Sequence, residues 1–199
     1  GRAFSQYLAK QNIIFSEQEI YRTYTGKKTV SIISDLSEKY NIQDKEIFFK
    51  EIMSIANNMY INELTTTTGI KKLLDSIQYF KLIASNSPKK RIIKGLKKVG
   101  LIKYFDENNI FSFDMVENPK PHPDVYLKAV EVTGIEPKNT VIIEDSIVGI
   151  QAGIAANMRV VGLTSGGHWL GRSPQSLLDI GAHNVATNCI ELINILKKL

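Results

Sequence analysis

Three short polar segments carry the side chains best suited to chemistry, and each is placed where an element ends or begins. The segment 84–87 offers hydroxyl and amide groups, Lys120 stands in a proline-rich loop, and Glu144 and Asp145 follow the apolar run 141–143. Small polar groups before a helix favour an anion, because free N–H groups and the helix dipole attract negative charge. Two adjacent carboxylates at the end of a buried strand repel each other and require a cation. These residue types therefore predict an anion site and a cation site.

The acidic pair Glu144 and Asp145 suits Mg²⁺, which prefers oxygen ligands. A helix cap would explain Asp145 without any ligand, but it leaves Glu144 unexplained. Gly149 and Gly153 follow at positions expected in a helix that packs closely on a sheet. The pair therefore predicts a Mg²⁺ site at the end of this strand.

The other two segments also have purely structural interpretations. Ser87 followed by Pro88 is typical of a helix start, with the serine as cap and the proline in the first turn. Three prolines surround Lys120 within five positions, and such a rigid loop either aims the ammonium group or simply lies on the surface. Asp124 is expected to cap the next helix, and His122 to be a partly exposed loop residue.

The elements that must position these segments alternate between helix and strand after residue 69. Helices are predicted at 70–77, 88–99, 123–133, 146–157, 174–180 and 189–199, and strands at 80–84, 110–113, 140–143, 159–163 and 183–186. Strands separated by helices pair in parallel, in an α/β, Rossmann-like, doubly wound sheet. Ligands of such sheets bind outside the carboxyl ends of the strands, where the polar segments lie.

The first 63 residues show only helical periodicity, which predicts a small all-helical domain. Ser16 followed by Glu19 has the spacing of a capping box. A polar, threonine-rich run then interrupts the pattern. The predicted organisation is therefore a helical domain at 1–63, a linker at 64–68 and the α/β domain at 69–199.

Composition excludes several classes of protein. Of the 199 residues, 43% are hydrophobic and 23% charged, as in ordinary globular proteins. The single cysteine, Cys189, cannot form a disulfide within the chain, and no apolar run reaches the length that a transmembrane helix needs. We expect a cytoplasmic protein without a membrane partner.

The net charge of +5 comes mainly from a basic stretch between Lys89 and Lys103. A basic stretch suggests nucleic-acid binding. Here Ile92, Ile93 and Leu96 recur at helical spacing, so the lysines form the solvated side of an amphipathic helix, and no aromatic residues interleave to stack on bases. We therefore expect no nucleic-acid partner.

The three segments together resemble the second, third and fourth motifs of the haloacid dehalogenase superfamily. Ser85 and Asn86 are followed by Lys120, 35 residues after Ser85, and Glu144 and Asp145 begin 24 residues later. The resemblance covers essentially the whole chain: residues 1–63 resemble the helical cap and residues 69–199 the core of the subgroup that contains β-phosphoglucomutase and small-metabolite phosphatases.

This resemblance implies phosphoryl transfer through an aspartyl-phosphate on a phosphorylated sugar or similar small metabolite. It implies that Ser85 and Asn86 hold the phosphoryl oxygens, that Lys120 neutralises charge, and that Glu144 and Asp145 position Mg²⁺. Fixed positive charge around a transferring phosphoryl group is what such chemistry requires. A monomer or weak dimer is expected.

Two further expectations concern the cap. Lys27, within 26–28, lies where the family carries a substrate-specificity loop, so Lys27 is expected to reach the substrate, although a helix-end lysine is the plain alternative. Ala56 takes the place that a lysine holds in β-phosphoglucomutase, which favours hydrolysis over mutation.

The family's first motif, Asp-x-Asp, is absent from these 199 residues. We expect further residues before Gly1 that form a strand ending in this motif. A phosphosugar mutase and a non-catalytic relative without the nucleophile remain the alternatives.

Overall fold

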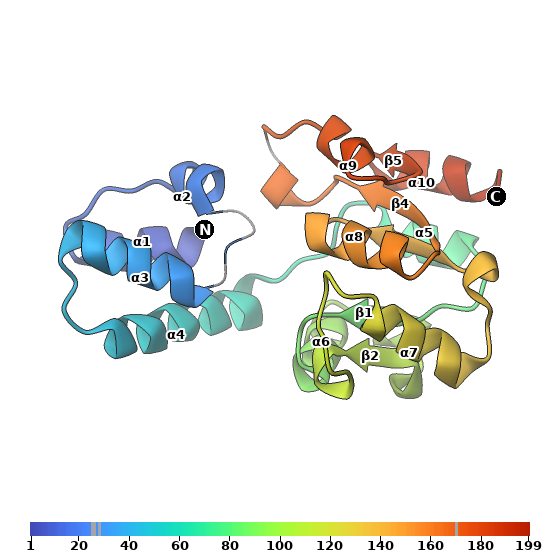
Figure 1. Ribbon diagram of the computed structural model, residues 1–199, viewed down its shortest axis with the longest axis horizontal. Helices are drawn as coiled ribbons and strands as arrows, with labels where there is room; N and C mark the ends of the chain where they lie inside the picture. Colours follow the sequence, from blue (N-terminus) through green and yellow to red (C-terminus); the bar gives the residue numbers. More distant parts are fainter. Residues whose placement is uncertain (25–26, 28, 170) are drawn as a thin grey trace. The chain divides into compact units, whose positions relative to one another are not determined.

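Two units of different architecture make up the chain, Gly1–Leu64 and Thr65–Leu199 (Figure 1). The computed structural model describes residues 1–24, 27, 29–169 and 171–199. Within these residues, no helix has both the length and the apolar character needed to cross a membrane.

The first unit is built from helices around an aromatic centre. Its helices are α1 (Arg2–Lys10), α2 (Glu17–Tyr24), α3 (Thr29–Tyr40) and α4 (Lys45–Glu63). The fully buried Phe48 stacks on Tyr7, with 4.2 Å between the ring centroids. The predicted capping box is confirmed, because Ser16 N donates to Glu19 Oε2 at 2.8 Å and Glu19 N donates to Ser16 Oγ at 3.2 Å.

The second unit alternates strands and helices as predicted. Its strands are β1 (Ile83–Ser85), β2 (Ile110–Ser112), β3 (Val141–Glu144), β4 (Arg159–Leu163) and β5 (Asn184–Ala186). Its helices are α5 (Ile70–Ser76), α6 (Lys89–Lys98), α7 (Asp124–Thr133), α8 (Ile147–Ala155), α9 (Gln175–Asp179) and α10 (Cys189–Leu196), with short 3₁₀ turns η1 (Ile102–Tyr104), η2 (Glu107–Asn109), η3 (Phe113–Met115), η4 (Pro137–Asn139) and η5 (Gly167–Trp169).

Helices cover both faces of the strands, which is the doubly wound arrangement. Val160 of β4 packs in a core with residues of α7, α8 and α9, whereas its neighbour Val161 packs in a core with residues of α5 and α10. Successive side chains of a strand point to opposite faces, so each face of β4 is buried by its own helices. The predicted α/β fold class is confirmed.

The strands pair in parallel but form two sheets within the described residues. One sheet has the order β1-β2 and the other β3-β4-β5. Strands of parallel sheets are normally buried on both faces, yet Val141 and Ile143 of β3 are 36% and 39% exposed. Among the described residues, β1 and β3 each lack a partner strand on one edge.

Two predicted helix caps, Ser87 and Asp124, are wrong, and the alternative of Asp145 as a cap is excluded as well. Pro88, not Ser87, is the cap residue of α6, and it makes no side-chain cap bond. Asp124 opens α7 but turns back to accept hydrogen bonds from N and Nδ2 of Asn118, both at 3.1 Å. Ser146, not Asp145, caps α8, where its Oγ accepts from Gly149 N at 3.1 Å. Asp124 thus ties down the loop that carries Lys120, and Asp145 is released from a capping role.

Candidate active site

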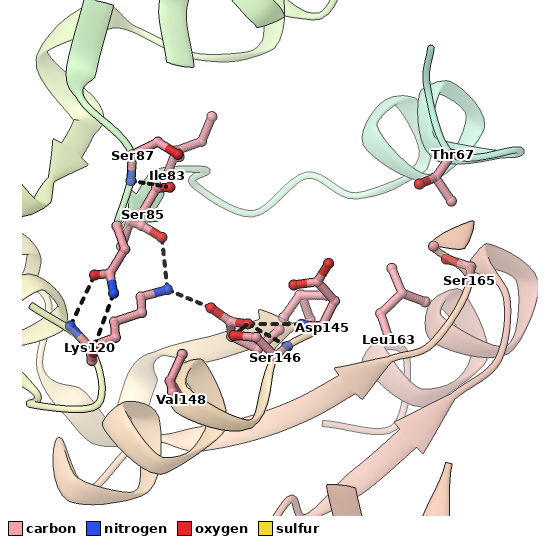
Figure 2. Close-up of a pocket in the computed structure, with 15 residues that line it drawn as sticks. Thr67, Ile83, Ser85, Ser87, Lys120, Asp145, Ser146, Val148, Leu163 and Ser165 are labelled. Atoms are coloured by element: carbon pink, nitrogen blue, oxygen red, sulfur yellow. Dashed lines mark hydrogen bonds and ion pairs between the residues drawn. The ribbon is translucent and has the colours of Figure 1, made fainter. Parts of the chain in front are cut away.

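A pocket of about 480 Å³ opens at the carboxyl ends of the strands of the second unit (Figure 2). Its lining brings together all three polar segments singled out in the sequence: Ser85, Asn86, Lys120, Glu144 and Asp145. These residues come from β1, β3 and the loops that follow strands, as expected for an open parallel sheet. The pocket lies wholly within residues of one unit.

Lys120 is the centre of this site. Its side chain is only 5% exposed, and its Nζ donates to Ala84 O at 3.0 Å and to Glu144 Oε1 at 2.5 Å. The ammonium therefore connects the end of β1 to the end of β3. An ammonium has three N–H donors. Two of them have acceptors among the described residues, so the third is available to a ligand.

Asn86 holds the backbone of Lys120 in place. Its Oδ1 accepts from Lys120 N and its Nδ2 donates to Lys120 O, both at 3.0 Å. The amide of Asn86 thus makes two hydrogen bonds to the loop. Its effect on the pocket is to hold Lys120 in position.

Ser85 retains a donor for a ligand. Its Oγ accepts from Ser87 N at 3.1 Å. A hydroxyl group has one donor and two acceptor positions, so this contact leaves the O–H proton available. Ser85 lies four residues before the start of α6, whose N-terminal end favours an anion.

Glu144 is a buried carboxylate whose oxygens are occupied by protein donors. Oε1 accepts from Lys120 Nζ and, at 3.1 Å, from the hydroxyl of Tyr126. Oε2 accepts from Asp145 N at 2.9 Å and from N and Oγ of Ser146 at 3.0 and 2.9 Å. A side chain at Gly149 would collide with the carboxyl group, so glycine is needed there.

The electrostatics of Glu144 follow from these contacts. Burial by itself would raise the pKa of Glu144, but the charge and hydrogen bond of Lys120, with the donors of Ser146, outweigh it and lower the pKa. The cation that the sequence requires beside Glu144 is thus supplied within the protein by Lys120.

Asp145 has the opposite environment. Its side chain is 58% exposed, and its Oδ2 lies 3.5 Å from Nε2 of His168. Burial and the negative charge of Glu144 raise the pKa of Asp145 and outweigh the opposite effects of His168 and Lys120. Its backbone oxygen accepts from the indole of Trp169 at 2.8 Å, which fixes the residue at the pocket.

A metal ion would therefore find one available carboxylate here. The described residues contain no group of three or more histidine, cysteine, aspartate or glutamate side chains that could hold a metal. Asp145 fits a hard cation by its charge and exposure, whereas the oxygens of Glu144 are already used. Of the two acidic residues, only Asp145 has a carboxylate free to bind Mg²⁺. The other oxygen ligands would have to come from water, the substrate or other residues.

The remaining predicted residues either do not line this pocket or lie outside the residues that the structure describes. Lys27 belongs to the first unit, where its Nζ pairs with Asp35 Oδ2 at 2.9 Å; Gly26 and Lys28 lie outside the described residues. His122 is an exposed loop residue and does not line the pocket.

Two contributors were missed in the sequence, Tyr126 and Trp169. Tyr126 is 5% exposed on α7, and Trp169 is 4% exposed in η5. Both look like core aromatics in the sequence, because neither adjoins one of the three polar segments. Only their contacts with Glu144 and with the backbone of Asp145 connect them to the site.

The fold and the site together define a Rossmann-like α/β core with a buried lysine at a pocket. The chain belongs to the haloacid dehalogenase-like hydrolase family, whose family model matches residues 2–163. It is 27% identical over 187 residues to a phosphorylated carbohydrates phosphatase of Thermotoga maritima, covering 92% of this chain and 83% of that protein. It is 22% identical over 165 residues to 6-phosphogluconate phosphatase of Escherichia coli, covering 80% and 72%.

A solved structure extends the similarity to three dimensions. A haloacid dehalogenase family hydrolase from Deinococcus radiodurans, with bound phosphate and sodium, superimposes with a TM-score of 0.85 at 27% identity, covering 99% of this chain and 87% of that one. The family assignment made from the three motifs is confirmed, and the chain is a phosphoric monoester hydrolase of this family.

Proposed function

We propose that the protein is a Mg²⁺-dependent phosphatase that acts on a phosphorylated sugar or a similar small metabolite through an aspartyl-phosphate. The observation that carries this proposal is the buried ammonium of Lys120, which is held by Ala84 O and Glu144 at a pocket of about 480 Å³. A fixed positive charge in a site of low polarity stabilises an anion far more strongly than one in water.

Lys120 and Ser85 would bind the phosphoryl oxygens. The ammonium would donate its third N–H, Ser85 would donate its hydroxyl, and the N-terminal end of α6 would add backbone dipoles. Asn86 and Glu144 would fix the position of Lys120. Because these groups are ordered before the substrate arrives, little reorganisation would accompany charge development in the transition state.

Mg²⁺ would supply positive charge that lets an anionic nucleophile approach an anionic phosphoryl group. Asp145 would be its carboxylate ligand, because this side chain is exposed and its pKa is raised. Glu144 would contribute through its negative charge and through its contact with Lys120. This assignment gives the two acidic residues different tasks.

The nucleophile would come from a strand that precedes Gly1. In the part of the chain that the structure describes, β1 and β3 each have one edge without a partner strand. These edges and the exposed Val141 and Ile143 support a further strand beside them. A strand ending in Asp-x-Asp at this place would bring its carboxylate to Lys120. The codons upstream of Gly1 test this directly, and a stable protein without such a strand would contradict it.

Hydrolysis is favoured over the mutase reaction by one residue of α4. A half-buried Ala56 stands where the resemblance places a lysine in β-phosphoglucomutase. A methyl group carries no charge to assist return of the phosphoryl group to a sugar. Lys27 of the first unit is the proposed contact for the sugar.

The test uses the protein expressed from its complete gene with Mg²⁺ and a panel of sugar phosphates. We expect release of inorganic phosphate without an isomerised product. Lys120→Ala should lower turnover at least a hundredfold, on the scale of losing a transition-state electrostatic contact. Lys97→Ala, on the solvated side of α6, should leave it unchanged. Formation of an isomer without free phosphate would indicate a mutase. The absence of any reaction would indicate a non-catalytic protein.

A further inference from the structure

Tyr126 is the one aromatic residue that contacts both members of the Lys120–Glu144 pair among the described residues. Its hydroxyl donates to Glu144 Oε1 at 3.1 Å, and Lys120 Nζ lies 4.5 Å from the centroid of its ring. The side chain comes from α7, and it does not line the pocket. It therefore acts on any ligand through the two charged groups.

The two contacts restrict the ammonium in complementary ways. Glu144 Oε1 accepts from both Tyr126 and Lys120, so the hydroxyl fixes the oxygen that in turn holds the ammonium. The ring face attracts a cation and cannot serve as a strong directional acceptor. A lysine has three rotatable donors; two of them are bound by Ala84 O and Glu144 Oε1, and Lys120 lines the pocket.

The contact itself makes the hydroxyl of Tyr126 the donor, because the carboxylate oxygen of Glu144 can only accept. Burial, together with the negative charge of Glu144, raises the pKa of Tyr126 far above its usual range. The side chains of Lys120 and Glu144 are themselves only 5% and 10% exposed.

We propose that Tyr126 is a positioning residue that fixes the direction of the Lys120 ammonium through Glu144 Oε1 and the ring face. The inference deepens the proposed function and rests on it, because the third N–H is the donor offered to the phosphoryl group. A Tyr126 that served only to fill the core would contribute to stability but not to turnover.

Two substitutions separate the contacts. Tyr126→Phe retains the ring and removes the hydroxyl, whereas Tyr126→Leu removes both. The matched control is Tyr104→Phe, because the hydroxyl of Tyr104 donates to Asp75 at 2.7 Å and Lys103 Nζ lies 4.9 Å from its ring, away from the pocket. Each variant is made in the protein expressed from its complete gene.

The first readout is nitrogen-15 NMR of the lysine ammonium groups, with Lys120 identified by loss of its signal in Lys120→Met. We expect a slowly exchanging signal in the wild type that shows the ring-current shift of Tyr126. Tyr126→Phe should keep the shift and accelerate proton exchange, and Tyr126→Leu should abolish the shift. An unchanged Lys120 signal in both variants would overturn the inference, whether or not the protein is a phosphatase.

The second readout is phosphate release from the substrates of the panel. Tyr126→Phe should lower kcat about tenfold with KM changed less than twofold, on the scale of losing one hydrogen bond to a charged group. Tyr104→Phe should stay within twofold of the wild type. A Tyr126→Phe variant with wild-type kcat but a lower Tm would refute positioning and leave a core role. Failure of the wild type to release phosphate would instead refute the proposed function, and the NMR result would then decide on Tyr126 alone.

Discussion

The strongest energetic prediction concerns the buried pair Lys120 and Glu144. Lys120→Met keeps the apolar stem and removes the charge, which leaves Glu144 buried without its cation. Breaking a buried pair by removing one partner costs about 3–5 kcal/mol. Glu144 keeps donors from Tyr126, Asp145 and Ser146, so we expect a loss near the lower end, about 3 kcal/mol at pH 7.

The partner substitution Glu144→Gln should cost a similar amount, because it leaves the ammonium of Lys120 buried with a neutral amide. The double variant removes both charges together. We expect it to lose about 3 kcal/mol rather than the sum of the two single losses, since the charges are coupled at 2.5 Å. The control is the ion pair of Lys97 and Glu107, whose side chains are 60% and 54% exposed. Lys97→Met should change the free energy of unfolding by less than about 1 kcal/mol.

The pH dependence gives a second signature. Because the wild-type pKa of Glu144 is lowered from its usual 4.5, the stability that it contributes is present above that value and lost as the pH falls through the lower folded pKa. Without Lys120, only the remaining hydrogen bonds oppose burial, so the pKa of Glu144 rises above its wild-type value. The variant then takes up its proton at a higher pH than the wild type, so the difference in the free energy of unfolding between the two proteins narrows as the pH is lowered from 7.

The assay is urea unfolding of the protein expressed from its complete gene, followed by fluorescence of Trp169, the one tryptophan of these 199 residues. Trp169 is 4% exposed and donates to Asp145 O beside the site, so its signal reports on this unit. Two results would refute the reasoning: a loss below about 1 kcal/mol for Lys120→Met, or strictly additive losses in the double variant.

Two further predictions concern the neighbours of this pair. Gly149→Ala places a methyl group against the carboxyl of Glu144, and it should cost about 1–3 kcal/mol in the same unfolding assay; an unchanged midpoint would contradict the close approach. Asp145→Ala should raise the Mg²⁺ concentration needed for half-maximal phosphate release while retaining the Lys120 ammonium signal, and an unchanged Mg²⁺ requirement would exclude Asp145 as a ligand.

The sequence was sufficient to predict which strand ends meet. Polar segments that follow the strands of a parallel sheet lie at the same edge of the sheet, whatever the details of packing. Ser85, Lys120 and Asp145 could therefore be placed in one pocket from the sequence alone. Helix and strand alternation was equally visible. It depends on local periodicity, which the sequence carries directly.

What the sequence could not show is which partner each polar group selects. Asn86 suited a phosphate contact by type, yet its amide pairs with the backbone of Lys120 34 residues away. Ser87 and Asp124 suited helix caps by local preference, but neither caps a helix, because Pro88 takes the cap position of α6 and Asn118 takes the carboxylate of Asp124. Such choices depend on tertiary distances, which local patterns do not encode.

The acidic pair shows how neighbouring residues of the same kind acquire different chemistry. Side chains at successive positions of a strand diverge, and Glu144 turns to Lys120 and the start of α8 while Asp145 remains largely exposed. The pKa of Glu144 is lowered and that of Asp145 is raised, so the first carboxylate is compensated and the second is not. A divalent cation at this edge would gain most from Asp145, and its binding would leave the Glu144–Lys120–Tyr126 contacts intact. Substitutions of Glu144 and of Asp145 should therefore have different effects, although the two residues are adjacent in the chain. The first should disturb the position of Lys120, and the second should weaken metal binding.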